Sequence, residues 1–189
     1  LLDAGVNYID TAESYKNQPA VGKGIQGRDR KTIFITSKLE IKKEDTKETL
    51  TNRFNKSLEE LQTDYIDAMM IHSCPDVETV KHADFHAVMA EMKSKGRLRF
   101  IGISNHGASF VEEAKIPMED VLCAAAADGR FDVMLLTYNF LSLEGGDKVL
   151  QACAEKNIGT TLMKVNPVGS YYKLKERIGS GGRSCRSTT

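Results

Sequence analysis

The sequence predicts an α/β fold in which a parallel sheet is covered by helices. Six short apolar runs each end in polar residues, and amphipathic segments lie between them. Strands that alternate with helices form βαβ units, which bring the carboxyl ends of the strands to one rim of the sheet. We therefore expect acid, base and amide side chains to gather there, where β/α barrels carry their chemistry. The six runs are residues 7–10, 34–38, 69–72, 101–105, 136–139 and 161–164.

The first residues predict the last turn of a helix. Gly5 follows this turn, and glycine readily adopts the left-handed conformation in which helices often end. We expect the natural start of the domain to lie before Leu1.

Residues 22–27 match the G-x-G-x-x-G pattern of dinucleotide-binding loops. Such a loop must follow a strand directly, and it needs an acidic residue about 20 positions later. Here the preceding strand ends near Asp10, and position 42 is Lys42. We therefore predict a short helix in which Val21 and Ile25 face inward.

Three longer segments have helical periodicity. In residues 45–62 apolar side chains recur every three or four positions, and Asp45 and Glu48 are placed as a capping pair. Residues 82–95 have one apolar face and are followed by a glycine as a stop signal. A third helix is expected around residues 149–154.

Length and composition are those of one globular domain. The chain has 189 residues, of which 41% are hydrophobic, and this is enough for a sizeable core. Because 26 acidic side chains balance 26 basic ones, neither a nucleic acid nor a membrane surface is an expected partner. No apolar run approaches the roughly 20 residues that span a bilayer, and the given sequence does not open with the basic and apolar regions typical of a secretory leader. We expect a soluble, cytoplasmic protein.

The four cysteines are dispersed and form no C-x-x-C pair, so neither a zinc site nor a disulfide framework is predicted. We expect buried free thiols, among them an inert Cys74 two positions beyond His72. Three further histidines, namely His82, His86 and His106, are predicted to serve packing or the surface. From residue 179 on almost nothing is apolar, so we expect a domain over residues 1–178 and a flexible tail over residues 179–189.

Four motifs follow one another on alternating elements. They are Asn-Tyr-Ile-Asp-Thr-Ala-Glu-Ser-Tyr at residues 7–15, Phe-Ile-Thr-Ser-Lys at residues 34–38, the stretch from Ser-Leu-Glu-Glu-Leu to Ile-His at residues 57–72, and the stretch from Gly-Arg to Ile-Gly-Ile-Ser-Asn at residues 96–105. Together they resemble the aldo-keto reductases, and the similarity extends to about Gly169. The resemblance implies an incomplete (β/α)8 TIM barrel, truncated at both ends, with approximately strands two to seven present. It also implies reduction of an aldehyde or ketone with NADPH and without a metal.

The resemblance implies a catalytic tetrad of Asp10, Tyr15, Lys38 and His72. A carbonyl that receives hydride develops negative charge on oxygen, and a positioned acid must protonate it. We expect Tyr15 to be this acid, with the Lys38 ammonium lowering the pKa of the phenol from about 10 toward about 7 or 8. Asp10 would hold Lys38, and His72 would orient the carbonyl and donate a hydrogen bond. Taken singly, each residue has a plainer explanation as a paired surface charge or a cap on the core.

The resemblance also implies that Ser104 and Asn105 bind the nicotinamide carboxamide and that Lys164 faces the site. Two positions depart from the family pattern. Leu135 stands where many members have a glutamine that also holds the carboxamide. Val165 and Lys164 stand where an aromatic residue often stacks on the nicotinamide. We therefore expect a weaker or differently built cofactor site, and the choice between NADPH and NADH stays open.

Two classes of function remain open. The first is an NADPH-dependent oxidoreductase that acts on a small-molecule carbonyl compound. The second is a non-catalytic barrel remnant that binds a cofactor or a partner. The retained tetrad favours the first, and the open edges of an incomplete sheet predict self-association.

Overall fold

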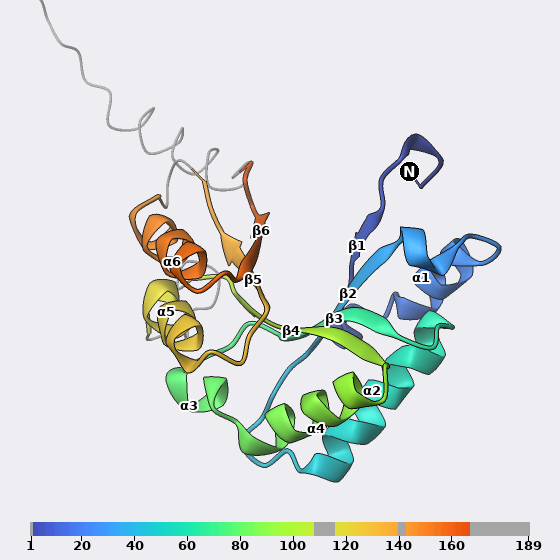
Figure 1. Cartoon of the computed structure of the whole chain (residues 1–189), viewed down its shortest axis with the longest axis horizontal. Helices are drawn as coiled ribbons and strands as arrows, with labels where there is room; N and C mark the ends of the chain where they lie inside the picture. The colour runs from blue at the N-terminus through green and yellow to red at the C-terminus, as the bar shows by residue number, and fades with distance from the viewer. Residues whose placement is uncertain (1, 108–115, 140–142, 167–189) are drawn as a thin grey trace, which may run out of the picture.

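The computed structural model describes residues 2–107, 116–139 and 143–166. In these ranges six strands form one parallel sheet in the order of the sequence (Figure 1). The strands are β1 (Tyr8–Asp10), β2 (Phe34–Leu39), β3 (Ile66–Ile71), β4 (Leu98–Asn105), β5 (Val133–Thr137) and β6 (Gly159–Met163). The α-helices are α1 (Gln18–Ile25), α2 (Lys47–Leu61), α3 (Val77–Val80), α4 (Ala83–Ser94), α5 (Met118–Asp128) and α6 (Leu143–Glu155). Short 3-10 helices are η1 (Leu2–Ala4), η2 (Glu13–Tyr15) and η3 (Arg30–Thr32).

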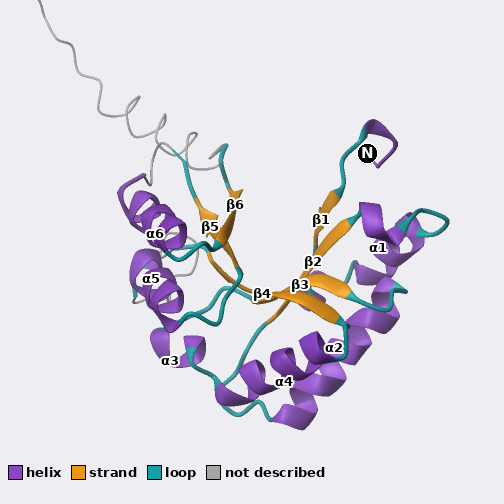
Figure 2. Cartoon of the chain, in the orientation of Figure 1, coloured by secondary structure: helices purple, strands orange, loops and turns teal. Residues whose placement is uncertain are grey.

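The sheet curls into a half-barrel, and the helices cover its convex outer face (Figure 2). The predicted incomplete (β/α)8 barrel is therefore confirmed. The predicted domain boundary and tail at residues 178 and 179 lie outside the described residues.

The two faces of the sheet differ in what they bury. Met69 and Ile71 on β3 belong to the core between the sheet and the helices. Because side chains alternate along a strand, Met70 faces the inner side instead. Its register partners are Lys38 on β2 and Gly102 on β4. A Cβ atom at Gly102 would lie 2.6 Å from Cγ of Met70, so a glycine is needed for the interior to close around this methionine.

Helix α2 is amphipathic as predicted, because its apolar residues Leu50, Phe54, Leu58 and Leu61 are all buried. Its N-cap differs from the prediction. The capping box consists of Thr46 and Thr49, each of which accepts a hydrogen bond from the backbone N–H of the other. The predicted pair of Asp45 and Glu48 is therefore wrong by one residue.

Helix α1 covers most of the G-x-G-x-x-G segment, as the sequence predicts. Ile25 is buried and Val21 packs against the core. A Cβ atom at Gly22 would lie 2.6 Å from the backbone carbonyl oxygen of Glu60 on α2. This glycine therefore permits the close approach of two helices. At the other predicted helix end, Gly5 has a φ of 85° and follows η1.

The described cysteines are free, and Cys74 and Cys153 are buried. Burial raises the pKa of the Cys74 thiol to about 12. In the described part of the chain, no helix combines the length and the apolar character needed to cross a membrane.

Candidate functional site

The four predicted tetrad residues lie together at the carboxyl end of the sheet. Asp10 ends β1, and Tyr15 ends η2, which follows it. Lys38 is the fifth residue of β2, and His72 directly follows β3. Nζ of Lys38 donates to Oδ1 of Asp10 at 2.5 Å and to the carbonyl oxygen of Thr11 at 2.9 Å. The structure therefore brings together one acid, one base, one phenol and one imidazole from three neighbouring strands.

Tyr15 and Asp10 are the exposed members of this group. The side chain of Tyr15 is 47% exposed, whereas that of Lys38 is 1% exposed. Nζ of Lys38 lies over the phenol ring, 5.0 Å from its centroid. The ring of His72 stands edge-on to the phenol, with the ring centroids 5.5 Å apart. Within the described residues the hydroxyl of Tyr15 has no hydrogen-bond partner, so it is available to a ligand.

The phenol of Tyr15 is not acidified in this structure. Its pKa is raised above the usual value of 10.0, first by burial and then by the Asp10 carboxylate. The expected lowering by Lys38 is therefore wrong here. The physical reason is that the Lys38 ammonium is paired with Asp10 at 2.5 Å, which offsets its charge. Tyr15 accordingly carries its proton at neutral pH.

His72 is buried, and one side of its ring is held by neighbouring residues. Nδ1 lies 3.2 Å from Oγ of Ser14 and 3.8 Å from Oε1 of Glu40. Burial lowers the pKa of His72, and the nearby Lys38 ammonium lowers it further. The imidazole is therefore neutral at neutral pH.

Ser104 and Asn105 lie at the end of β4, next to the strand that precedes His72. Oγ of Ser104 accepts a hydrogen bond from the backbone N–H of Ser73 at 3.0 Å. Nδ2 of Asn105 donates to the carbonyl oxygen of Cys74 at 2.7 Å. Both side chains thus bind the loop after β3. Lys164 follows β6, two strands away from β4.

His106 lies at the site, although the sequence suggested only packing or the surface. Its ring centroid is 6.4 Å from that of His72. Burial lowers the pKa of His106 to about 4, with the charge of Lys164 as the next contribution. A second neutral imidazole therefore lies beside the first. The available signal was its position, because it directly follows the Ser104-Asn105 pair at a strand end.

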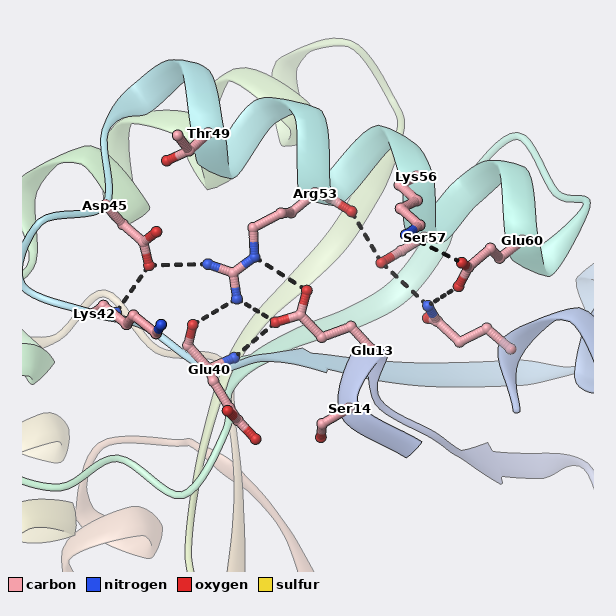
Figure 3. Close-up of a pocket in the computed structure, with 11 residues that line it drawn as sticks. Glu13, Ser14, Glu40, Lys42, Asp45, Thr49, Arg53, Lys56, Ser57 and Glu60 are labelled. Carbon is pink, nitrogen blue, oxygen red and sulfur yellow. Dashed lines mark hydrogen bonds and ion pairs between the residues drawn. The ribbon is translucent and has the colours of Figure 1, made fainter. Parts of the chain in front are cut away.

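A groove of about 550 Å³ beside the tetrad is built around Arg53 of α2 (Figure 3). The guanidinium forms a bidentate ion pair with the carboxylate of Glu13. It also donates to Oδ2 of Asp45 at 2.9 Å and to the carbonyl oxygen of Glu40 at 2.6 Å. Glu13 begins η2, the turn that ends in Tyr15. Arg53 therefore anchors the turn that presents the phenol, and sequence reasoning did not identify it.

Replacing Arg53 by methionine is expected to lower the free energy of unfolding by about 2 kcal/mol, because hydrogen bonds to charged groups contribute about that much. Urea denaturation followed by circular dichroism measures this change. The control is Lys56→Met on the same helix. Lys56 is 72% exposed and approaches Glu60 only to 3.8 Å, so no measurable change is expected. Equal unfolding midpoints for Arg53→Met and the unsubstituted chain would contradict the anchoring role.

In the ranges that the structure describes, no cluster of three or more His, Cys, Asp or Glu residues could hold a metal ion. The tetrad offers a protonated phenol, a neutral imidazole and a paired ammonium.

Comparisons with known proteins agree with this architecture. A family model described as the aldo/keto reductase family matches residues 1–182. Over 115 residues the chain is 36% identical to a methylglyoxal reductase, DkgB, of Salmonella typhi. The aligned residues make up 60% of this chain and 43% of that protein. The chain spans less than half the length of the curated relatives that it matches.

Solved structures are similar over a larger share of the chain. An aldo/keto reductase from Brucella melitensis has a TM-score of 0.70 at 25% identity, covering 97% of this chain and 67% of that one. An aldo-keto reductase from Bombyx mori, solved in complex with NADP, has a TM-score of 0.59 at 23% identity, covering 84% of this chain and 52% of that one. The half-barrel thus matches the corresponding part of larger barrels.

Proposed function

Because this chain belongs to the aldo/keto reductase family, we propose that it carries the catalytic half of an oxidoreductase that reduces an aldehyde or ketone to an alcohol. NADPH is the proposed hydride source, and Tyr15 is the proposed general acid. The observation that carries this proposal is the contact of Asp10, Lys38, Tyr15 and His72 at one end of the sheet.

The proton comes from Tyr15 in this proposal. The carbonyl oxygen gains negative charge as hydride reaches the carbon, and the phenol donates its proton to that oxygen. Tyr15 is suited to this role because it is protonated at neutral pH and its hydroxyl is available. Burial and the Asp10 carboxylate both disfavour the phenolate that remains. Lys38, which is paired with Asp10, is the cation of the tetrad that lies over the phenol ring.

His72 supplies the second contact to the carbonyl oxygen. Its ring lies edge-on to that of Tyr15, with the ring centroids 5.5 Å apart, and we assign both groups to one carbonyl oxygen. A neutral imidazole can donate one hydrogen bond to the developing charge, and donors fixed in advance stabilise such a transition state most effectively.

The cofactor, when bound, supplies hydride to the carbonyl carbon. We assign its carboxamide to Ser104 and Asn105, and we assign Lys164 a further contact. The donor set suits this group, because the Asn105 amide retains a second N–H beyond its bond to Cys74. The NADP bound by the Bombyx mori relative supports NADPH over NADH.

The pH dependence of reduction is expected to follow the protonated phenol. Because the pKa of Tyr15 is raised above 10.0, kcat/KM for carbonyl reduction should be constant through neutral pH. On the alkaline side it should fall as the pH rises past that pKa, because the phenol then loses the proton that it must donate. Initial rates of NADPH oxidation across the pH range measure this profile. A decline already centred near pH 8, at about the value for an acidified phenol, would contradict the protonated state assigned to Tyr15.

A substrate panel tests the proposed function. The chain is incubated with NADPH or NADH and with simple aldehydes, ketones and methylglyoxal, the substrate in the name of the Salmonella typhi relative. Loss of the near-ultraviolet absorbance of the reduced cofactor reports turnover. The expected result is carbonyl-dependent oxidation, faster with NADPH. Cofactor binding without turnover of any carbonyl compound would instead indicate a non-catalytic barrel.

A further inference from the structure

The imidazole of His72 has one nitrogen in a hydrogen bond and one without a partner. Nδ1 lies 3.2 Å from Oγ of Ser14. Among the described residues Nε2 has no hydrogen-bond partner. This nitrogen is not fully buried. Nε2 is therefore the nitrogen that a ligand can reach. Ser14 is the middle residue of η2, next to Tyr15, so the contact ties that turn to the end of β3.

We propose that Ser14 is a positioning residue whose hydroxyl donates to Nδ1 of His72 and thereby keeps the ring proton on Nε2. For its catalytic consequence this inference rests on the proposed function. The tautomer itself is a property of the chain without any ligand.

The ring of His72 is neutral at neutral pH. His72 is buried beside the Lys38 ammonium, and both effects lower its pKa, so the ring carries one proton at neutral pH. A neutral imidazole has one donor and one acceptor nitrogen, and the hydrogen bond made by one nitrogen decides the role of the other. A serine hydroxyl rotates freely and can donate to the unprotonated nitrogen.

Three carboxylates act on the ring of His72. The Glu40 carboxylate lies 3.8 Å from Nδ1 and would favour a proton there, but this distance exceeds that of a hydrogen bond. The Glu40 side chain is 58% exposed, so water screens its charge. Asp10 and Glu13 also raise the pKa of the ring, each by less than Glu40 does. Of the described groups, only Ser14 is hydrogen-bonded to Nδ1.

The tautomer of His72 decides whether the ring presents a donor or a lone pair to the carbonyl oxygen. With its proton on Nε2, His72 presents a donor to the carbonyl oxygen while that oxygen gains negative charge. With its proton on Nδ1, the ring would present a lone pair to the same oxygen. Ser14 therefore acts on the reaction through His72 rather than by touching the substrate.

Nuclear magnetic resonance of the chain labelled with 15N-histidine tests the tautomer directly. Long-range 1H–15N spectra at neutral pH distinguish a protonated ring nitrogen from an unprotonated one, and His72→Gln identifies the signals of this ring. We expect the Nε2–H form in the unsubstituted chain and in Ser14→Thr, which keeps the hydroxyl. In Ser14→Ala the signals should shift toward a mixture of both tautomers. An Nδ1–H form in the unsubstituted chain, or a spectrum that changes in Glu40→Gln but not in Ser14→Ala, would overturn the inference.

Kinetics separate positioning from folding. Ser14→Ala should lower kcat about tenfold with little change in KM, which corresponds to the loss of about one hydrogen bond, and Ser14→Thr should restore kcat. Thermal unfolding of both variants reports any effect on the fold. If no form turns over any carbonyl compound, the proposed function fails, whereas the spectra still decide the tautomer. A tenfold loss of kcat in both Ser14→Ala and Ser14→Thr would contradict the positioning role of the Ser14 hydroxyl.

Discussion

Replacing Asp67 by asparagine is expected to destabilise the fold by about 3 kcal/mol, the lower end of the cost of breaking a buried ion pair. The Asp67 side chain is fully buried on β3. Its carboxylate accepts hydrogen bonds from Arg30 at 2.7 Å, from Arg99 at 2.5 Å and from the backbone N–H of Ile35 at 2.9 Å. An asparagine would remove the charge that compensates both guanidinium groups and would place its own N–H donors against them. Urea denaturation measures the change.

Asp64→Asn is the matched control for this prediction. Asp64 lies three residues earlier and is exposed, so its substitution should leave the unfolding midpoint unchanged. A loss for Asp67→Asn no larger than that for Asp64→Asn would show that the carboxylate is not needed to join β2, β3 and β4.

Elements with strong local patterns could be predicted from the sequence. The six strands were identifiable because each apolar run ends in polar residues, and this places Asp10 and Lys38 at the same end of the sheet. Helix α2 was identifiable because its apolar residues repeat at helical spacing. Its N-cap was not, because Asp45 with Glu48 and Thr46 with Thr49 have the same spacing, and only the backbone geometry distinguishes them.

Other features depend on contacts that carry no local signal. Helix α5 was not predicted, because the alanines at residues 124–127 give little contrast between its faces. Arg53 lies on an amphipathic helix, where an arginine usually indicates a solvated face, and its partner Glu13 is 40 residues away. The pKa of Tyr15 depends on its burial and on the nearby Asp10 carboxylate, which the order of residues does not determine.

Replacing Tyr15 by phenylalanine is expected to reduce turnover by about a hundredfold to ten-thousandfold, the range that general acid catalysis typically contributes. The fold should be unaffected, because the side chain is 47% exposed and its hydroxyl has no hydrogen-bond partner within the described residues. Tyr65→Phe is the matched control. Its hydroxyl donates to the carbonyl oxygen of Arg30 at 3.3 Å just before β3, at the opposite end of the sheet from the tetrad. Turnover by this control should equal that of the unsubstituted chain.

The rate of carbonyl-dependent NADPH oxidation by Tyr15→Phe is the most direct test of the claim that this phenol donates the proton. NADPH binding is measured on the same samples by isothermal titration calorimetry. If Tyr15 donates the proton, we expect unchanged NADPH binding by Tyr15→Phe and a rate of NADPH oxidation at least about a hundredfold below that of the unsubstituted protein. Equal rates for the two forms would contradict this role and would assign the proton to another group.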